Sequence, residues 1–103
     1  MLIEIKSFEE FERSIAVGTC IVDFFATWCG PCKMLAPVLE EVSEAEDFQD
    51  VKIIEVDIDR YGEVAARYGI QAVPTLILIK DGVEQKRSLG YINKNQIYSF
   101  VGK

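Results

Sequence analysis

An apolar run in the first third of the chain, Cys20–Ala26, constrains the fold more than any other stretch. The run is rich in β-forming residues, and Asp23 is its only charged member. A strand with one solvent-exposed face alternates apolar and polar residues. This continuous apolar run therefore predicts a strand that is covered on both faces. Helices cover both faces of a sheet in α/β proteins. We therefore predict an α/β fold with this strand in the interior of the sheet.

The rest of the chain predicts alternating strands and helices in one domain, residues 1–103, which is a usual length for a single domain. Strand patterns occur at Leu2–Ile5, Cys20–Ala26, Val51–Ile58, Thr75–Lys80 and Val83–Leu89. Helical patterns run from the Ser7 cap to near Gly18, from Lys33 to about Ala45, from Glu63 to Arg67, and from the Asn93 cap to Val101.

This order predicts a mixed five-stranded sheet with strand order 1-3-2-4-5, flanked by four helices. The first three strands are separated by helices, which favours parallel pairing through right-handed crossovers. The last two strands are joined by Asp81-Gly82, a hairpin turn that requires antiparallel pairing. The second strand then lies in the middle, between the third and the fourth.

The composition of the chain indicates which classes of partner it does not bind and in which cellular compartment it works. The net charge is −6 and no basic run is present, so we expect no binding to nucleic acid or to an anionic membrane. The longest apolar run, Thr75–Ile79, is too short to cross a bilayer, and the N-terminus has no signal-peptide pattern. Three cysteines are too few for a secreted disulfide framework. We expect a cytoplasmic protein, although a mature exported form would have the same composition.

Two of the cysteines, Cys29 and Cys32, are separated by Gly30 and Pro31, directly after the predicted central strand. Open α/β sheets place their sites at this end of a strand. The unpaired N–H groups and the dipole of a helix N-terminus stabilise a thiolate, which is the nucleophilic form of cysteine. We expect Cys29 to be the exposed, reactive thiol and Cys32 to be buried one turn further on, close enough to form a disulfide.

Metal binding and a structural disulfide are the alternatives for this pair. A closed zinc site needs four ligands, but the chain has no histidine and its third cysteine, Cys20, lies at the far end of the strand. A disulfide across two residues removes little chain entropy. A C-x-x-C pair beside a βαβ pattern favours redox chemistry, so we expect no metal site.

Three stretches carry a resemblance to a known family: VDFFATWCGPCKMLAP (22–37), VDIDRYGEVAARYGIQAVPTLILIKDG (56–82) and Gly90. They resemble the thioredoxins over essentially the whole chain. The resemblance implies a thioredoxin fold and general protein-disulfide reductase activity, with a role in electron transfer to target proteins and in cell redox homeostasis. Cys29 would attack a substrate disulfide, and Cys32 would resolve the mixed disulfide.

The resemblance also implies partners and further site residues. A separate thioredoxin reductase that uses NADPH and FAD would recycle a monomer whose only redox group is the Cys29–Cys32 disulfide, with no bound cofactor. Asp23 would be a buried acid that exchanges a proton with Cys32, whereas a solvated or hydrogen-bonded edge carboxylate is the alternative from the residues alone. A cis Val73–Pro74 bond would face the disulfide. The implied substrate-binding residues are Trp28, Gly30, Pro31, Ile58, Val73, Pro74 and Gly90.

Three positions depart from the family pattern: Phe25 stands where many members have tryptophan, Glu55 where many have lysine, and Tyr91 where small residues are usual. Glu55 either reaches past the helix ends to water or turns toward Asp23, where two carboxylates could not both ionise cheaply. An oxidase or isomerase, or a redox-independent binding module, remains an alternative function. The Gly-Pro pair between the cysteines favours the reductase.

Overall fold

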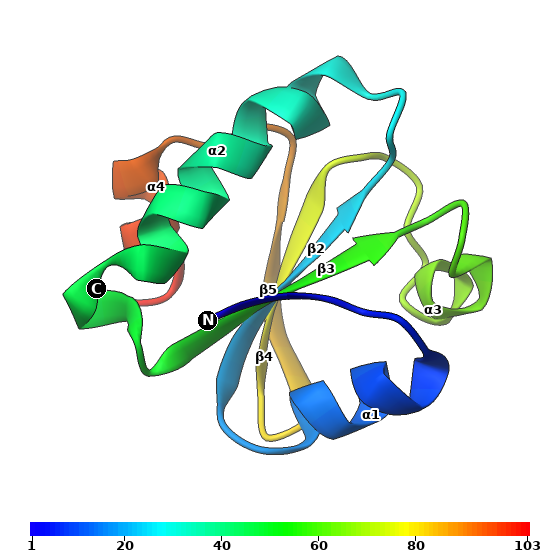
Figure 1. The fold of residues 1–103 in the computed structure, drawn as a ribbon, viewed down its shortest axis with the longest axis horizontal. Helices are drawn as coiled ribbons and strands as arrows, with labels where there is room; N and C mark the ends of the chain where they lie inside the picture. The colour runs from blue at the N-terminus through cyan, green and yellow to red at the C-terminus, as the bar shows by residue number, and fades with distance from the viewer.

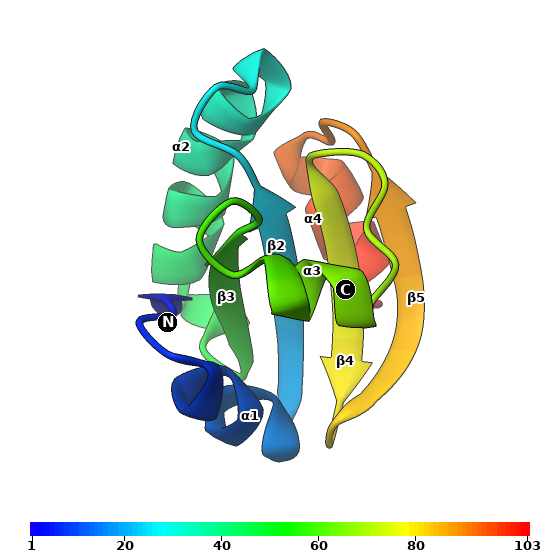
Figure 2. The same cartoon turned by 90° about the vertical axis from the view of Figure 1, so that its right-hand side faces the viewer.

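The computed structural model describes residues 1–103, whose five strands form one mixed sheet in the order β1-β3-β2-β4-β5. The predicted strand order is therefore confirmed, and Figure 2 shows β3, β2, β4 and β5 side by side in that order. β3 pairs in parallel with β1 and β2, whereas β4 pairs antiparallel with β2 and β5. The strands are β1 (Leu2–Glu4), β2 (Thr19–Phe25), β3 (Val51–Asp57), β4 (Thr75–Lys80) and β5 (Val83–Leu89).

Two helices cover each face of the sheet. α1 (Phe8–Ala16) and α3 (Gly62–Arg67) pack on one face, and α2 (Gly30–Glu44) and α4 (Lys94–Phe100) pack on the other. Figure 1 looks along the sheet, with α2 and α4 on one side of it and α1 and α3 on the other. A short 3₁₀-helix, Glu46–Phe48, was not expected from the sequence.

β2 has the predicted position and both of its faces are buried. Val22 and Phe24 enter the core beneath α1 and α3, while Ile21 enters the core beneath α2 and α4. Asp23 lies on the α2 side of the same strand and exposes 3% of its surface. Cys20 is fully buried, and burial raises its pKa to about 11. This supports the interpretation of Cys20 as a small core residue.

The beginning of α2 differs from the prediction. The helix starts at Gly30 rather than at Lys33, because the Cys29 side chain caps it by accepting the N–H of Cys32. Pro31 fits the first turn, where its missing N–H costs no intrahelical hydrogen bond. The whole Gly-Pro-Cys segment therefore belongs to the helix, and both cysteines are held by regular backbone.

Candidate functional site

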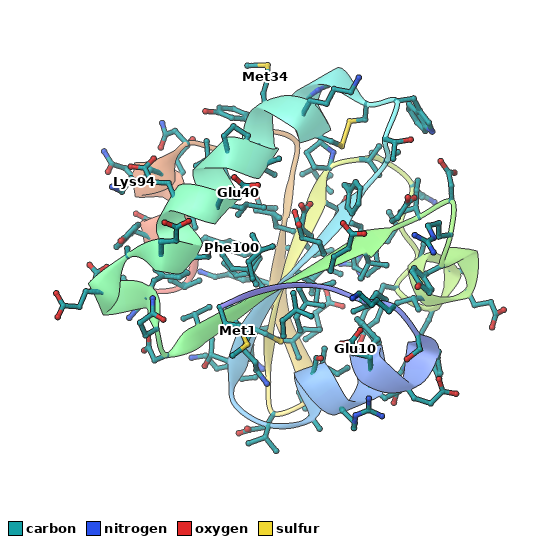
Figure 3. All side chains as sticks on the ribbon, in the orientation of Figure 1. Met1, Glu10, Met34, Glu40, Lys94 and Phe100 are labelled. Atoms are coloured by element: carbon teal, nitrogen blue, oxygen red, sulfur yellow. A yellow bond between two sulfur atoms is a disulfide. The ribbon has the colours of Figure 1, made fainter.

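Cys29 and Cys32 form a disulfide where β2 leads into α2, with their Cα atoms 5.3 Å apart. Figure 3 shows this bond in yellow at the N-terminal end of α2. The Cys32 N–H lies 3.2 Å from the Cys29 Sγ to which it donates. This N–H and the helix dipole stabilise negative charge on Cys29 when the disulfide is reduced.

Both cysteines are buried in the disulfide form. Cys29 exposes 5% of its surface and Cys32 exposes 6%, so the predicted exposure of Cys29 is wrong for this form. Ile58 and Val73 pack against the two sulfurs and cover them. The two cysteines differ in their polar surroundings. The Sγ of Cys29 lies 3.7 Å from the carbonyl oxygen of Val73, whereas Cys32 lines a cavity that opens to solvent.

The loop before β4 closes over Cys29. The Val73–Pro74 peptide bond is cis, as the resemblance implied. The Gly90 N–H donates to the Pro74 carbonyl at 2.8 Å, and Gly90 has a φ of 84°, a conformation that favours glycine. Gly90 is therefore held against the Val73–Pro74 segment that contacts Cys29, although the two come from separate parts of the chain.

An apolar surface with an exposed tryptophan adjoins the disulfide. Trp28 is 68% exposed, and its Nε1–H donates to Asp59 Oδ2 at 2.9 Å. A groove of about 150 Å³ runs beside it and is lined by Trp28, Ile58, Ile70, Gln71, Ala72 and Val73. Gly30 and Pro31 are exposed on the first turn of α2. Sequence reasoning missed Asp59 and the loop 70–72, because no local pattern shows which loops meet in space.

Asp23 lies behind the disulfide. It lines a cavity of about 300 Å³ together with Cys32, Lys33 and Glu55, and its Oδ1 has no hydrogen-bond partner in the protein. Burial raises the pKa of Asp23 well above its usual value, and the neighbouring Glu55 carboxyl raises it further. Asp23 is therefore buried, as the resemblance implied, and is not a solvated edge carboxylate.

Glu55 faces Asp23 across the β2–β3 pair and is half-buried. Burial raises the pKa of Glu55 most, and the negative charge of Glu4 raises it further. The alternative in which Glu55 reaches into water without sensing Asp23 is therefore wrong. The two carboxyl groups form one coupled pair beside the disulfide.

The side chains offer no arrangement for a metal ion, since no three His, Cys, Asp or Glu residues are grouped to hold one. None of the helices is both long enough and apolar enough to cross a membrane.

Known proteins are similar to this chain in sequence and in structure. The thioredoxin family model matches residues 3–103. A thioredoxin from Chlamydia trachomatis is 45% identical over 102 residues, which cover 99% of this chain and 98% of the relative. A Bacillus subtilis thioredoxin is 40% identical over 95 residues, covering 92% and 90% of the two chains.

Solved structures of other proteins superimpose closely on this fold. The thioredoxin of Malassezia sympodialis superimposes with a TM-score of 0.87 at 31% identity, covering 98% of this chain and 88% of the other. A thioredoxin from Nicotiana alata superimposes with a TM-score of 0.86 at 34% identity, covering 97% and 89%. Together with the disulfide at the start of α2, these matches show that the chain belongs to the thioredoxin family of protein-disulfide reductases.

Proposed function

We propose that this protein reduces disulfides in many cytoplasmic target proteins, with Cys29 as the nucleophile and Cys32 as the resolving thiol. The observation that carries the assignment is the capping geometry, since the Cys32 N–H donates to the Cys29 Sγ at the N-terminus of α2. This environment favours the thiolate of Cys29 over that of Cys32.

Two exchange steps complete the reaction. The Cys29 thiolate attacks one sulfur of the target disulfide, forms a mixed disulfide and releases the first target thiolate. Cys32 then loses its proton and attacks the Cys29 Sγ, which breaks the mixed disulfide and releases the second target thiolate. Two electrons pass to the target, and the protein is left with the Cys29–Cys32 disulfide.

Asp23 is the base proposed for the second step. Cys32 and Asp23 line the same cavity, and the unpartnered Oδ1 of Asp23 is free to accept a proton there, directly or through water. A buried carboxyl group with a raised pKa is a better match for a thiol than an ordinary aspartate, so it transfers the proton more readily in either direction.

Target proteins would dock on the apolar surface around the disulfide. Trp28 supplies an exposed aromatic face, and the groove beside it ends at Ile58 and Val73. Gly30, Pro31, Pro74 and Gly90 would let an extended target segment approach the sulfurs closely, because none of them projects a bulky side chain. The Val73 backbone would pair with that segment as a neighbouring strand would.

Recycling requires a reductant outside the chain. By family, the partner would be a thioredoxin reductase that carries electrons from NADPH through FAD, so the cofactors would belong to the partner. We propose a single-domain monomer that meets this reductase and its targets in turn. The net charge of −6 argues against nucleic acid and anionic membranes as partners.

A trapping experiment tests the roles of the cysteines. Cys32→Ser should accumulate mixed disulfides between Cys29 and target proteins, because the resolving thiol is gone. Cys29→Ser should accumulate none, and the double variant should fail to catalyse insulin-disulfide reduction by dithiothreitol. Equal trapping by the two single variants would contradict the assigned roles. Full biological activity of the double variant would favour a redox-independent binding module.

A further inference from the structure

Three carboxyl groups lie in one row across the sheet. Glu4 on β1 and Asp23 on β2 are both directly opposite Glu55 on the intervening strand β3. Adjacent strands are about 4.8 Å apart, and residues opposite one another in parallel strands project from the same face. All three residues line the cavity beneath α2 that also contains Cys32.

Solvent exposure of the three side chains increases along the row from Asp23 to Glu4. Asp23 is buried, Glu55 is half-buried and Glu4 is exposed. In the other direction the row continues to Leu76 on β4, which has no polar side-chain group. The row therefore leads from the cavity behind the disulfide to the surface at β1.

The acidic and cysteine side chains around the row are not arranged to hold a metal ion. From α2, Cys32 and the exposed Lys33 face the same cavity, and Glu40 acts on Glu55 through its charge. The one buried polar atom without a partner is the Asp23 Oδ1. A proton acceptor thus lies at the inner end of the row, beside Cys32.

We propose that Glu55 and Glu4 extend Asp23 into a carboxyl relay that carries the Cys32 proton between the disulfide and solvent. The proposal rests on the proposed role of Asp23 as the base for Cys32. Closely spaced carboxyl groups cannot all ionise cheaply, which favours a proton held between neighbours, and a relay needs both a proton and an acceptor.

In the resolving step, the relay moves one proton from Cys32 to water. The S–H bond of Cys32 breaks, its proton passes to Asp23, and its electron pair forms the bond to the Cys29 Sγ. The bond between Cys29 and the target sulfur breaks, and the target thiolate leaves with that electron pair and takes a proton from water. Asp23 passes a proton to Glu55, Glu55 passes one to Glu4, and Glu4 releases one to water.

A purely electrostatic effect of Glu55 gives a different expectation. Its negative charge helps to raise the pKa of Asp23, so Glu55→Gln should lower that pKa. If charge were the whole role, Glu55→Gln would slow the resolving step only as far as the weaker base Asp23 explains, and an added buffer base would not restore it. A relay loses its second member in this variant, so the step slows even when Asp23 is fully ionised.

Stopped-flow reaction of the reduced protein with a chromogenic aromatic disulfide, dithiobis-nitrobenzoate, separates the two exchange steps. Attack by Cys29 releases the first coloured thiolate, and attack by Cys32 releases the second. Glu55→Gln should slow the second phase at least about tenfold from neutral to mildly alkaline pH, within the range of general-base effects, and leave the first phase unchanged. Glu4→Gln should slow the second phase less, because Glu4 is already exposed to water.

Glu40→Gln is the matched control, since it removes a charge that Glu55 senses from a residue outside the row. Figure 3 labels Glu40 on α2. This variant should keep the wild-type second phase. Glu55→Asp, which retains a carboxyl group, should recover much of the rate. Rising concentrations of formate or imidazole should rescue Glu55→Gln but leave the wild type unaffected, a response that a merely structural role of Glu55 would not produce.

Asp23→Asn separates failure of the relay from failure of the proposed function. A slow second phase in Asp23→Asn with normal phases in Glu55→Gln and Glu4→Gln would overturn the relay and leave Asp23 as the base. A normal second phase in Asp23→Asn would overturn both. Equal slowing by Glu55→Gln and Glu40→Gln, without buffer rescue, would reduce Glu55 to a source of charge and overturn the relay.

Discussion

Asp23 combines a titratable group with almost complete burial, and its ionisation opposes folding. The pKa of Asp23 is raised, so the folded protein holds this proton more tightly than the unfolded chain does. Below the pKa that Asp23 has in the unfolded chain, this proton binding makes its full contribution to the stability of the fold. The contribution is lost as the pH rises through the pKa that Asp23 has in the folded protein.

We expect Asp23→Asn to stabilise the oxidised protein at pH 7 by at least about 1 kcal/mol, the scale for a buried polar group without a partner. Urea unfolding should show this gain shrinking as the pH falls from the raised folded pKa toward about 4, the usual pKa of aspartate, and vanishing below that pH.

Glu44→Gln is a suitable control for that measurement, because Glu44 is an exposed carboxylate at the end of α2. Glu44→Gln should change the free energy of unfolding at pH 7 much less than Asp23→Asn does, because Glu44 is exposed to water. A variant Asp23→Asn that is destabilised at pH 7 would show that the ionised carboxyl group is satisfied in the folded protein.

At the scale of the element, α2 makes two chemically identical thiols different. Cys29 caps the helix and receives the Cys32 N–H, whereas Cys32 lies inside the first turn beside a buried acid. Iodoacetamide should therefore label Cys29 first in the reduced protein near neutral pH, followed by Cys32. Cys20 should react last, because it is fully buried and its pKa is raised to about 11. Peptide mapping by mass spectrometry would measure the three rates.

The same labelling in urea tests whether the helix is the cause. Without α2 the cysteines lose the cap and the cavity, so their rates should converge. Faster labelling of Cys32 than of Cys29 in the folded protein would contradict the assignment of the nucleophile.

At the scale of the whole molecule, the net charge of −6 creates a negative field around a particle of 32 × 30 × 22 Å. The Debye length is about 30 Å at 0.01 M salt, so at that concentration an approaching target senses the whole protein. A disulfide peptide with flanking lysines should be reduced at least about threefold faster than the same peptide with flanking glutamates, since steering changes association rates by about tenfold or more. The difference should vanish at 1 M salt, where the Debye length is about 3 Å.

The measurement is the rate at which the lysine-flanked and glutamate-flanked peptides are reduced as the salt concentration increases. A peptide of zero net charge is the control and should respond little to salt. Equal rates for the lysine and glutamate peptides at low salt would mean that the exposed Lys33 beside the cavity outweighs the charge of the rest of the molecule.

The sequence by itself determined the order of the strands, the two cysteines and the buried acid. These features are local: the apolar run around Asp23 predicts a central strand, Ser7 and Asn93 cap their helices as expected, and Cys29 and Cys32 are neighbours in the chain. Tertiary structure alone decided which distant groups meet. The burial of Cys29 depends on Val73 and Ile58, the Trp28–Asp59 hydrogen bond joins two loops, and strand register places Glu4 and Asp23 on opposite sides of Glu55. The physical reason is that the period of a strand shows which face a side chain occupies, whereas its neighbour across the sheet is fixed by how all the strands pair.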